Sequence, residues 1–192
     1  EKFTQVHAER IAQEATSTGE IDIVDDFATR LPLNVILDVL NLPQEAHAMF
    51  HNWYPAMMNG ISGGPELRIA GKKANAEYHA YLDPLIHERS QNPGSDLLSQ
   101  LSIAEVDGKR MTPDEIKSFA SLILVAGAET TDKAIANLWY QLLSHPDQWR
   151  AVQEDPELVD RAFTEMMRIH GPAGAQTRRT INDVTLHGVT IP

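Results

Sequence analysis

The sequence predicts a mainly α-helical domain with a long central helix and a minor β-sheet near the C-terminus. Apolar residues recur at helical spacing along most of the chain, and proline and glycine divide this pattern into segments. The clearest helix start is Thr112-Pro113-Asp114-Glu115, where threonine can cap the helix, proline suits its first turn and glutamate completes a capping box. Residues 177–192, rich in Thr, Val and Ile, are typical of strands.

The first half of the chain divides into four predicted helices. They are expected over residues 3–18, from Leu31 to Pro43, over about 44–59 and over 66–90. Between the first two, the alternation of residues 21–24 favours a short strand or an extended link. The glycine-rich stretch 60–65 predicts a flexible turn, and Pro84 is expected to kink the fourth helix or to mark a boundary within it.

The second half contains the predicted central helix. Ser95 is a good cap for a short helix over 96–101, and Asp107-Gly108 is typical of a turn. The remaining elements are the central helix at about 113–144, a helix at about 156–170 and two short strands within 177–192. We interpret residues 1–192 as part of a single domain.

Composition excludes several classes of function. Sixteen Lys and Arg against 27 Asp and Glu give a net charge of −11, which disfavours a nucleic-acid-binding surface. No apolar stretch reaches the length of about 20 residues that a membrane span needs, and we find no secretory leader, so a soluble cytoplasmic protein is expected. The absence of cysteine excludes a disulfide framework, a cysteine–zinc site, a cysteine nucleophile and an iron–sulfur cluster within these residues.

The middle of the central helix carries the strongest functional pattern. Residues 119–128 are apolar around the whole circumference, which predicts burial on all sides. Ala126 and Gly127 are small and leave space beside the helix, and Glu129 and Thr130 then add an acid and a hydroxyl. The pattern predicts a notch with a proton donor and acceptor beside it. The alternative is that Gly127 lets another helix approach and that Glu129 begins a solvated end.

Three motifs in order give the chain a family resemblance. They are Ala126-Gly127-Ala128-Glu129-Thr130-Thr131, Glu165-x-x-Arg168, and a strand segment with Arg178-x-Thr180-x-x-Asp183-Val184 and Leu186-x-Gly188-x-x-Ile191-Pro192. Together they resemble the cytochrome P450 family, of the soluble bacterial type, over essentially the whole chain. The resemblance implies a helical fold, a haem b cofactor (iron protoporphyrin IX) and monooxygenase chemistry, in which one oxygen atom of O2 enters a small, largely apolar organic substrate.

The resemblance also implies what these residues lack. Haem in this family is held by a cysteine thiolate in a loop downstream of the Ile-Pro strand, and this sequence has no cysteine. We therefore expect an internal fragment that ends before that loop, has no iron ligand of its own and is inactive alone. A ferredoxin and its reductase are the electron donors that the resemblance implies.

Residue roles implied by the resemblance concentrate on the central helix. Glu129 and Thr130 would be catalytic, relaying protons to bound dioxygen. Ala126, Gly127 and Thr130 would contact the cofactor, and Arg178 would pair with a haem propionate. The residues expected to line the substrate pocket are Leu122, Val125, Ala126, Ala173 and Ala175. Glu165 and Arg168 would form a buried structural ion pair.

Two other functions remain open from the sequence. A non-catalytic binding domain on the same helical scaffold would keep the fold without the chemistry. A helical metal-dependent enzyme would use His47 and His51, which have the i,i+4 spacing that can share a zinc ion although Ala48 replaces the glutamate of zinc proteases. Asp25-Asp26 lacks the spacing of an aspartate-rich magnesium motif, and we interpret both as solvated loop acids.

Overall fold

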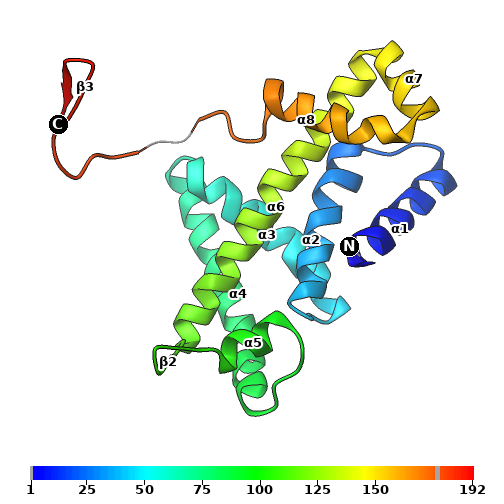
Figure 1. The fold of residues 1–192 in the computed structure, drawn as a ribbon. Helices are drawn as coiled ribbons and strands as arrows, with labels where there is room; N and C mark the ends of the chain where they lie inside the picture. The colour runs from blue at the N-terminus through cyan, green and yellow to red at the C-terminus, as the bar shows by residue number, and fades with distance from the viewer. Residues whose placement is uncertain (1, 176–177) are drawn as a thin grey trace.

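The protein, described here by a computed structural model over residues 2–175 and 178–192, is mostly helical (Figure 1). This confirms the predicted fold class. The helices are α1 (Lys2–Thr18), α2 (Arg30–Val39), α3 (His47–Ser62), α4 (Pro65–Gln91), α5 (Leu97–Ile103), α6 (Pro113–Ser144), α7 (Pro146–Glu154) and α8 (Val159–His170). The strands are β1 (Glu105–Val106), β2 (Lys109–Arg110), β3 (Val184–Leu186) and β4 (Val189–Ile191).

Helix α6 is the axis on which the other helices pack. It crosses the molecule in Figure 1, with α2, α3, α4, α5 and α8 against it. Its start is the predicted capping box, because the Glu115 N–H donates to Thr112 Oγ1 at 3.3 Å and the Thr112 N–H donates to Glu115 Oε2 at 2.7 Å. The local sequence therefore determines where the central helix begins.

Replacing Thr112 with alanine should lower the free energy of unfolding by about 1 kcal/mol, because the Glu115 N–H then loses its acceptor at the helix start. Urea unfolding followed by circular dichroism measures the change. Thr4→Ala is the matched control, because Thr4 is exposed within α1. Equal losses in the two variants would contradict a capping role for Thr112.

The hydrophobic core lies between α2, α3, α4, α5 and α6. Leu33 and Leu37 of α2 and Leu124 of α6 are fully buried in it. An aromatic cluster joins α3 to α4, with the Phe50 ring centroid 5.3 Å from that of Trp53 and 5.2 Å from that of Tyr78. Burying such large rings supplies much of the driving force for folding, so α3 and α4 form a tightly packed helical hairpin.

The turn between α3 and α4 is shorter than the glycine pattern predicts. Helix α3 continues through Gly60 to Ser62, and α4 begins at Pro65. Gly60 packs against Gly71 of α4, where a Cβ atom added to either residue would lie within 3.0 Å of the other's Cα. The prediction of a flexible turn over 60–65 was therefore wrong for its first three residues, because these glycines serve a close helix crossing.

Residues 21–24 form no strand. Residues Ile23–Thr29 make a wide π-helical segment that continues directly into α2. Asp22 caps it, since its carboxylate accepts from the N–H groups of Val24 at 2.8 Å and Asp25 at 2.9 Å, and the Asp22 N–H donates to Asp26 at 3.0 Å. These local side-chain bonds favour a helical start over an extended chain.

One other local prediction differs from the structure, and one helix was missed. Helix α4 continues through Pro84, which therefore marks no helix boundary, and Leu82 and Ile86 are buried on either side of it. The cap of α5 is Asp96 and not Ser95, since the Asp96 carboxylate accepts from the Ser99 N–H at 3.0 Å. His145-Pro146 ends α6 as predicted, but Pro146 also begins α7, which the sequence reading did not identify.

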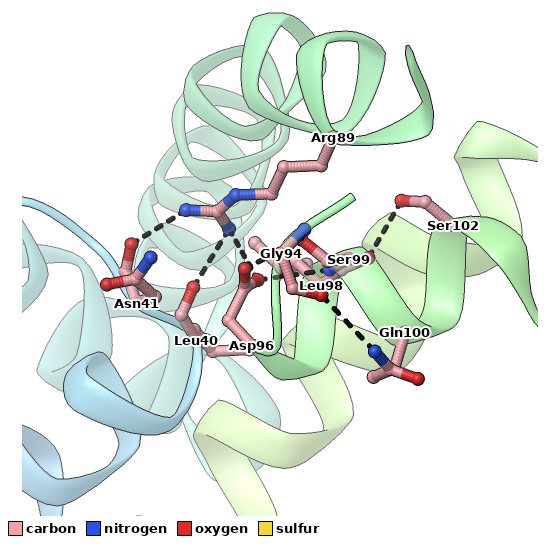
Figure 2. A network of polar contacts seen from close by, with 9 residues as sticks. All are labelled: Leu40, Asn41, Arg89, Gly94, Asp96, Leu98, Ser99, Gln100 and Ser102. Carbon is pink, nitrogen blue, oxygen red and sulfur yellow. Dashed lines mark hydrogen bonds and ion pairs between the residues drawn. The ribbon is translucent and has the colours of Figure 1, made fainter. Parts of the chain in front are cut away.

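A polar network holds the ends of α2, α4 and α5 together (Figure 2). The Arg89 guanidinium donates to the carbonyl oxygens of Leu40 at 2.9 Å and Asn41 at 2.7 Å, and it lies 3.2 Å from Asp96 Oδ1. The Asp96 carboxylate also accepts from the Ser99 hydroxyl at 2.6 Å. A single guanidinium thus satisfies carbonyls at the end of α2 and the acid that caps α5.

The C-terminal segment forms the predicted pair of strands. β3 and β4 pair antiparallel with Val184 opposite Ile191, and His187 and Gly188 at the turn both have positive φ, 50° and 79°. Two such residues are what a two-residue hairpin turn requires. In Figure 1 this hairpin lies apart from the helices, and its residues are exposed.

Candidate functional site

The centre of α6 places the predicted catalytic hydroxyl on an exposed strip. Phe119, Leu122, Ala126 and Thr130 share one face of the helix, which we call the exposed α6 strip. Phe119 is 40% exposed and Leu122 is 59% exposed. The predicted burial of residues 119–128 on all sides is therefore incomplete within the described residues, in which no segment covers this face.

The two threonines bond back to the helix as their sequence pattern suggests. Thr130 Oγ1 donates to the carbonyl oxygen of Ala126 at 3.1 Å, and Thr131 Oγ1 donates to that of Gly127 at 3.0 Å. The Thr130 hydroxyl proton is thus directed into the helix, and its oxygen remains an acceptor on the exposed α6 strip.

Gly127 serves the approach of another helix. A Cβ atom added there would lie 3.1 Å from Ile36 Cδ1 of α2, so a side chain would press on that contact. This geometry matches the alternative interpretation of Gly127 as a packing residue. Gly127 is itself exposed, and its added Cβ would meet α2 only at the Ile36 side chain, while Ala126 and Thr130 lie on the exposed α6 strip.

Glu129 pairs with Lys133 one turn later in α6, and its carboxylate is about one-third exposed. The next acid, Asp132, accepts a hydrogen bond from the Tyr54 hydroxyl of α3 at 2.8 Å. Burial raises the pKa of Asp132 above its ordinary value, although this hydrogen bond acts in the opposite direction. Burial and the nearby Asp132 also raise the pKa of Tyr54. The sequence reading missed this pair, because its partners lie 78 residues apart.

The Glu-x-x-Arg pair forms on α8. Arg168 Nε and Nη2 donate to the Glu165 carboxylate at 2.8 Å and 2.6 Å, and the guanidinium holds the pKa of Glu165 below its ordinary value. Both side chains are more than half exposed. The expectation of burial was wrong for the described residues, in which nothing covers this face of α8.

The predicted site residues of the C-terminal segment do not join those of α6. Ala173, Ala175 and Arg178 are exposed, and the hairpin that follows them lies apart from the helices in Figure 1.

Leu122 and Val125 line a groove of about 680 Å³ between α3, α4 and α6. We call it the α3–α4–α6 groove. Ala126, Ala173 and Ala175 are not among its lining residues. The sequence reading missed the others, which come from three helices: Met57, Gly60, Ile61, Arg68, Gly71, Lys72, Asn75, Ser118 and Ser121.

His47 and His51 line a separate cavity of about 500 Å³ together with His7, Arg10 and Arg30. Burial lowers the pKa of both His47 and His51. Within residues 2–175 and 178–192 no three His, Cys, Asp or Glu side chains are grouped as metal ligands. The geometry therefore gives the metal-dependent alternative no ligand set, and Asp25 and Asp26 lie in the π-helical segment.

Comparison with known proteins gives one consistent family. The profile described as Cytochrome P450 matches residues 37–192. The chain is 38% identical over 180 residues to the cytochrome P450 monooxygenase PikC of Streptomyces venezuelae, covering 93% of this chain and 42% of that protein. It is 34% identical over 191 residues to the steroid C26-monooxygenase of Rhodococcus jostii, covering 100% of this chain and 40% of that protein.

Solved structures agree with the sequence matches. The ligand-free cytochrome P450 TbtJ1 superposes with a TM-score of 0.85 at 35% identity, covering 100% of this chain and 53% of that one. P450BioI in complex with an acyl carrier protein ligated to hexadec-9Z-enoic acid superposes with a TM-score of 0.89 at 26% identity, covering 99% of this chain and 49% of that one. The chain spans about 40% of the length of these curated relatives. In the described part of the chain, no helix has the length and apolar character of a membrane span.

Proposed function

The chain belongs to the cytochrome P450 family, and from that premise we propose that it is part of a haem-dependent monooxygenase. The observation that carries the proposal is the exposed α6 strip, which lies inside the matched region and combines apolar residues, the small Ala126 and the Thr130 hydroxyl. Its substrate would be an organic molecule with an apolar body, because Leu122 and Val125 line the neighbouring groove. A ferredoxin with its reductase is the proposed electron donor.

The exposed α6 strip fits one face of a flat, apolar group such as haem b. Phe119 and Leu122 leave apolar surface in water, and covering it would be favourable. Ala126 is small enough for a ring to lie close to the helix. Haem, held by a thiolate, would supply the binding and activation of dioxygen. Because the 192 residues contain no cysteine, we propose that the thiolate comes from residues outside this sequence.

The proposed part of α6 in the chemistry is to hold and move a proton. The Thr130 oxygen is an acceptor at the surface of the exposed α6 strip, and rotation of its hydroxyl away from the Ala126 carbonyl would make it a donor there. Glu129 lies next to it and, when released from Lys133, can exchange protons with solvent. Gly127 supports this arrangement indirectly, since its contact with Ile36 sets the distance between α6 and α2.

The test replaces Thr130 with alanine in the haem-loaded protein that contains this chain. We expect about tenfold more hydrogen peroxide released per electron consumed, because protons no longer reach dioxygen in step with electrons. Thr131→Ala is the matched control, since Thr131 makes the same backbone hydrogen bond but lies off the exposed α6 strip. Unchanged peroxide release in Thr130→Ala, or an equal rise in Thr131→Ala, would contradict the proton-relay role. A haem-free product would contradict the proposed function itself.

A further inference from the structure

We propose that the α3–α4–α6 groove binds an amphipathic organic anion, with its carboxylate or similar group at Arg68 and Lys72 and its apolar body against α6. The inference rests on the proposed function only in taking this groove as the substrate pocket. It narrows the substrate class from an apolar molecule to one that carries both an apolar chain or ring and a negative charge.

Part of the groove lining is suited to an apolar body. Met57 and Ile61 of α3 line it together with Leu122 and Val125 of α6. Ile61 is 63% exposed and Leu122 is 59% exposed, so covering them removes apolar surface from water. The volume of about 680 Å³ lies within the range of roughly 300–1,000 Å³ for small-molecule sites.

The same groove is lined by two positive charges of α4 without a compensating acid. Arg68 and Lys72 lie one turn apart on α4, and the residues lining the groove include no acid. Arg68 Nε donates to the Gly63 carbonyl at 3.1 Å, which anchors the guanidinium beside the α3–α4 turn. In the described residues no carboxylate forms an ion pair with either cation.

The lack of an acid beside Arg68 and Lys72 is informative because acidic residues outnumber basic ones in the chain, 27 to 16. Other lysines on the same helices have acidic partners: Lys73 lies 3.8 Å from Glu77, and Lys117 lies 2.7 Å from Asp83. Two cations that face an acid-free groove in such a chain therefore complement an anionic ligand.

A series of hydrogen bonds beside the groove leaves one neutral donor for a ligand. His79 Nε2 lies 2.8 Å from Ser121 Oγ, which donates to Asn75 Oδ1 at 3.1 Å. Because the serine proton goes to Asn75, His79 is the donor to Ser121 and is held in one tautomer. Asn75 and Ser121 both line the groove, and the Asn75 amide nitrogen is left to donate to a ligand oxygen.

The test uses isothermal titration calorimetry with the full protein chain to compare two ligands that have the same ten-carbon tail. Decanoate should bind about tenfold more tightly than decan-1-ol, a difference in line with two partly exposed charge pairs. In the double variant Arg68→Gln, Lys72→Gln the two probes should bind alike. Lys73→Gln is the matched control, because Lys73 neighbours Lys72 but lies outside the groove, and it should keep the tenfold preference.

Equal binding of the two probes to the parent chain would overturn the inference, as would a preference that survives the double variant or disappears in Lys73→Gln. Circular dichroism verifies that each variant is folded. The haem spectrum of the complete protein with carbon monoxide separates this inference from the proposed function. A thiolate-type spectrum without the decanoate preference would refute only the anion site, and the preference without that spectrum would refute only the monooxygenase.

Discussion

Replacing Arg89 with alanine is expected to lower the free energy of unfolding by about 3 kcal/mol. The Arg89 and Asp96 side chains are 11% and 8% exposed, so this ion pair is largely buried. Removing the guanidinium takes a donor from the carbonyl oxygens of Leu40 and Asn41 and leaves the Asp96 charge with only its hydrogen bonds from Ser99 (Figure 2). The cost of such orphaned groups exceeds that of losing an exposed pair, which is usually below about 1 kcal/mol.

The same network predicts a dependence of stability on pH. Burial alone would raise the pKa of Asp96, but hydrogen bonds from Ser99 and the Arg89 charge outweigh it and hold the pKa below its ordinary value. A carboxyl whose pKa is lowered by folding contributes stability above its unfolded-state pKa of about 3.9, and this contribution is lost as the pH falls through the folded-state pKa. Stability should therefore fall in acid, and less steeply in Arg89→Ala.

Urea unfolding at pH 7 and at several values below pH 5 measures both effects. Arg150→Ala is the control, because Arg150 is exposed on α7. This substitution should change the free energy of unfolding by no more than about 0.5 kcal/mol. Arg89→Lys should recover only part of the stability, since an ammonium cannot reproduce the planar set of donors. Equal stability of the Arg89→Ala and Arg150→Ala variants would show that this network contributes nothing.

Elements with local determinants were predictable from the sequence. Thr112, Pro113 and Glu115 define the start of α6 within four residues, and His145-Pro146 defines its end, so both bounds agreed with the structure. The segment after Asp22 failed for a different reason. Its apolar alternation resembles a strand, but the Asp22 carboxylate and the Asp26 carboxylate together satisfy the first N–H groups of a helical segment. The apolar alternation and the Asp22 cap are both local signals, and the structure follows the cap.

The candidate site was predictable only where its members share one helix. Ala126 and Thr130 stand at i,i+4, so helical geometry alone places them on one face. Gly127 was ambiguous because its role depends on Ile36, which is 91 positions earlier in the sequence. The groove was not predictable as a whole, since Arg68 and Lys72 join Ser121 and Leu122 only when α4 packs on α6.

The crossing of α3 and α4 leads to the second large effect: Gly71→Ala should lower the free energy of unfolding by about 2 kcal/mol. A Cβ atom at residue 71 would lie 2.8 Å from the Gly60 Cα and 2.9 Å from the Ala56 carbonyl oxygen. Both are backbone atoms that cannot rotate aside, so the helices must separate, at a cost of about 3 kcal/mol at the upper end of typical overpacking. Alanine recovers about 1 kcal/mol through its higher helix propensity.

Separating α3 from α4 should also weaken ligand binding, because Gly60 and Gly71 both line the α3–α4–α6 groove. Decanoate should therefore bind Gly71→Ala several-fold more weakly than the parent chain. Gly174→Ala is the matched control, since a Cβ atom there meets nothing within 4 Å and its effect on both measurements should be small. If urea unfolding finds Gly71→Ala as stable as Gly174→Ala, then α3 and α4 do not cross at these glycines, and the groove between them has a different shape.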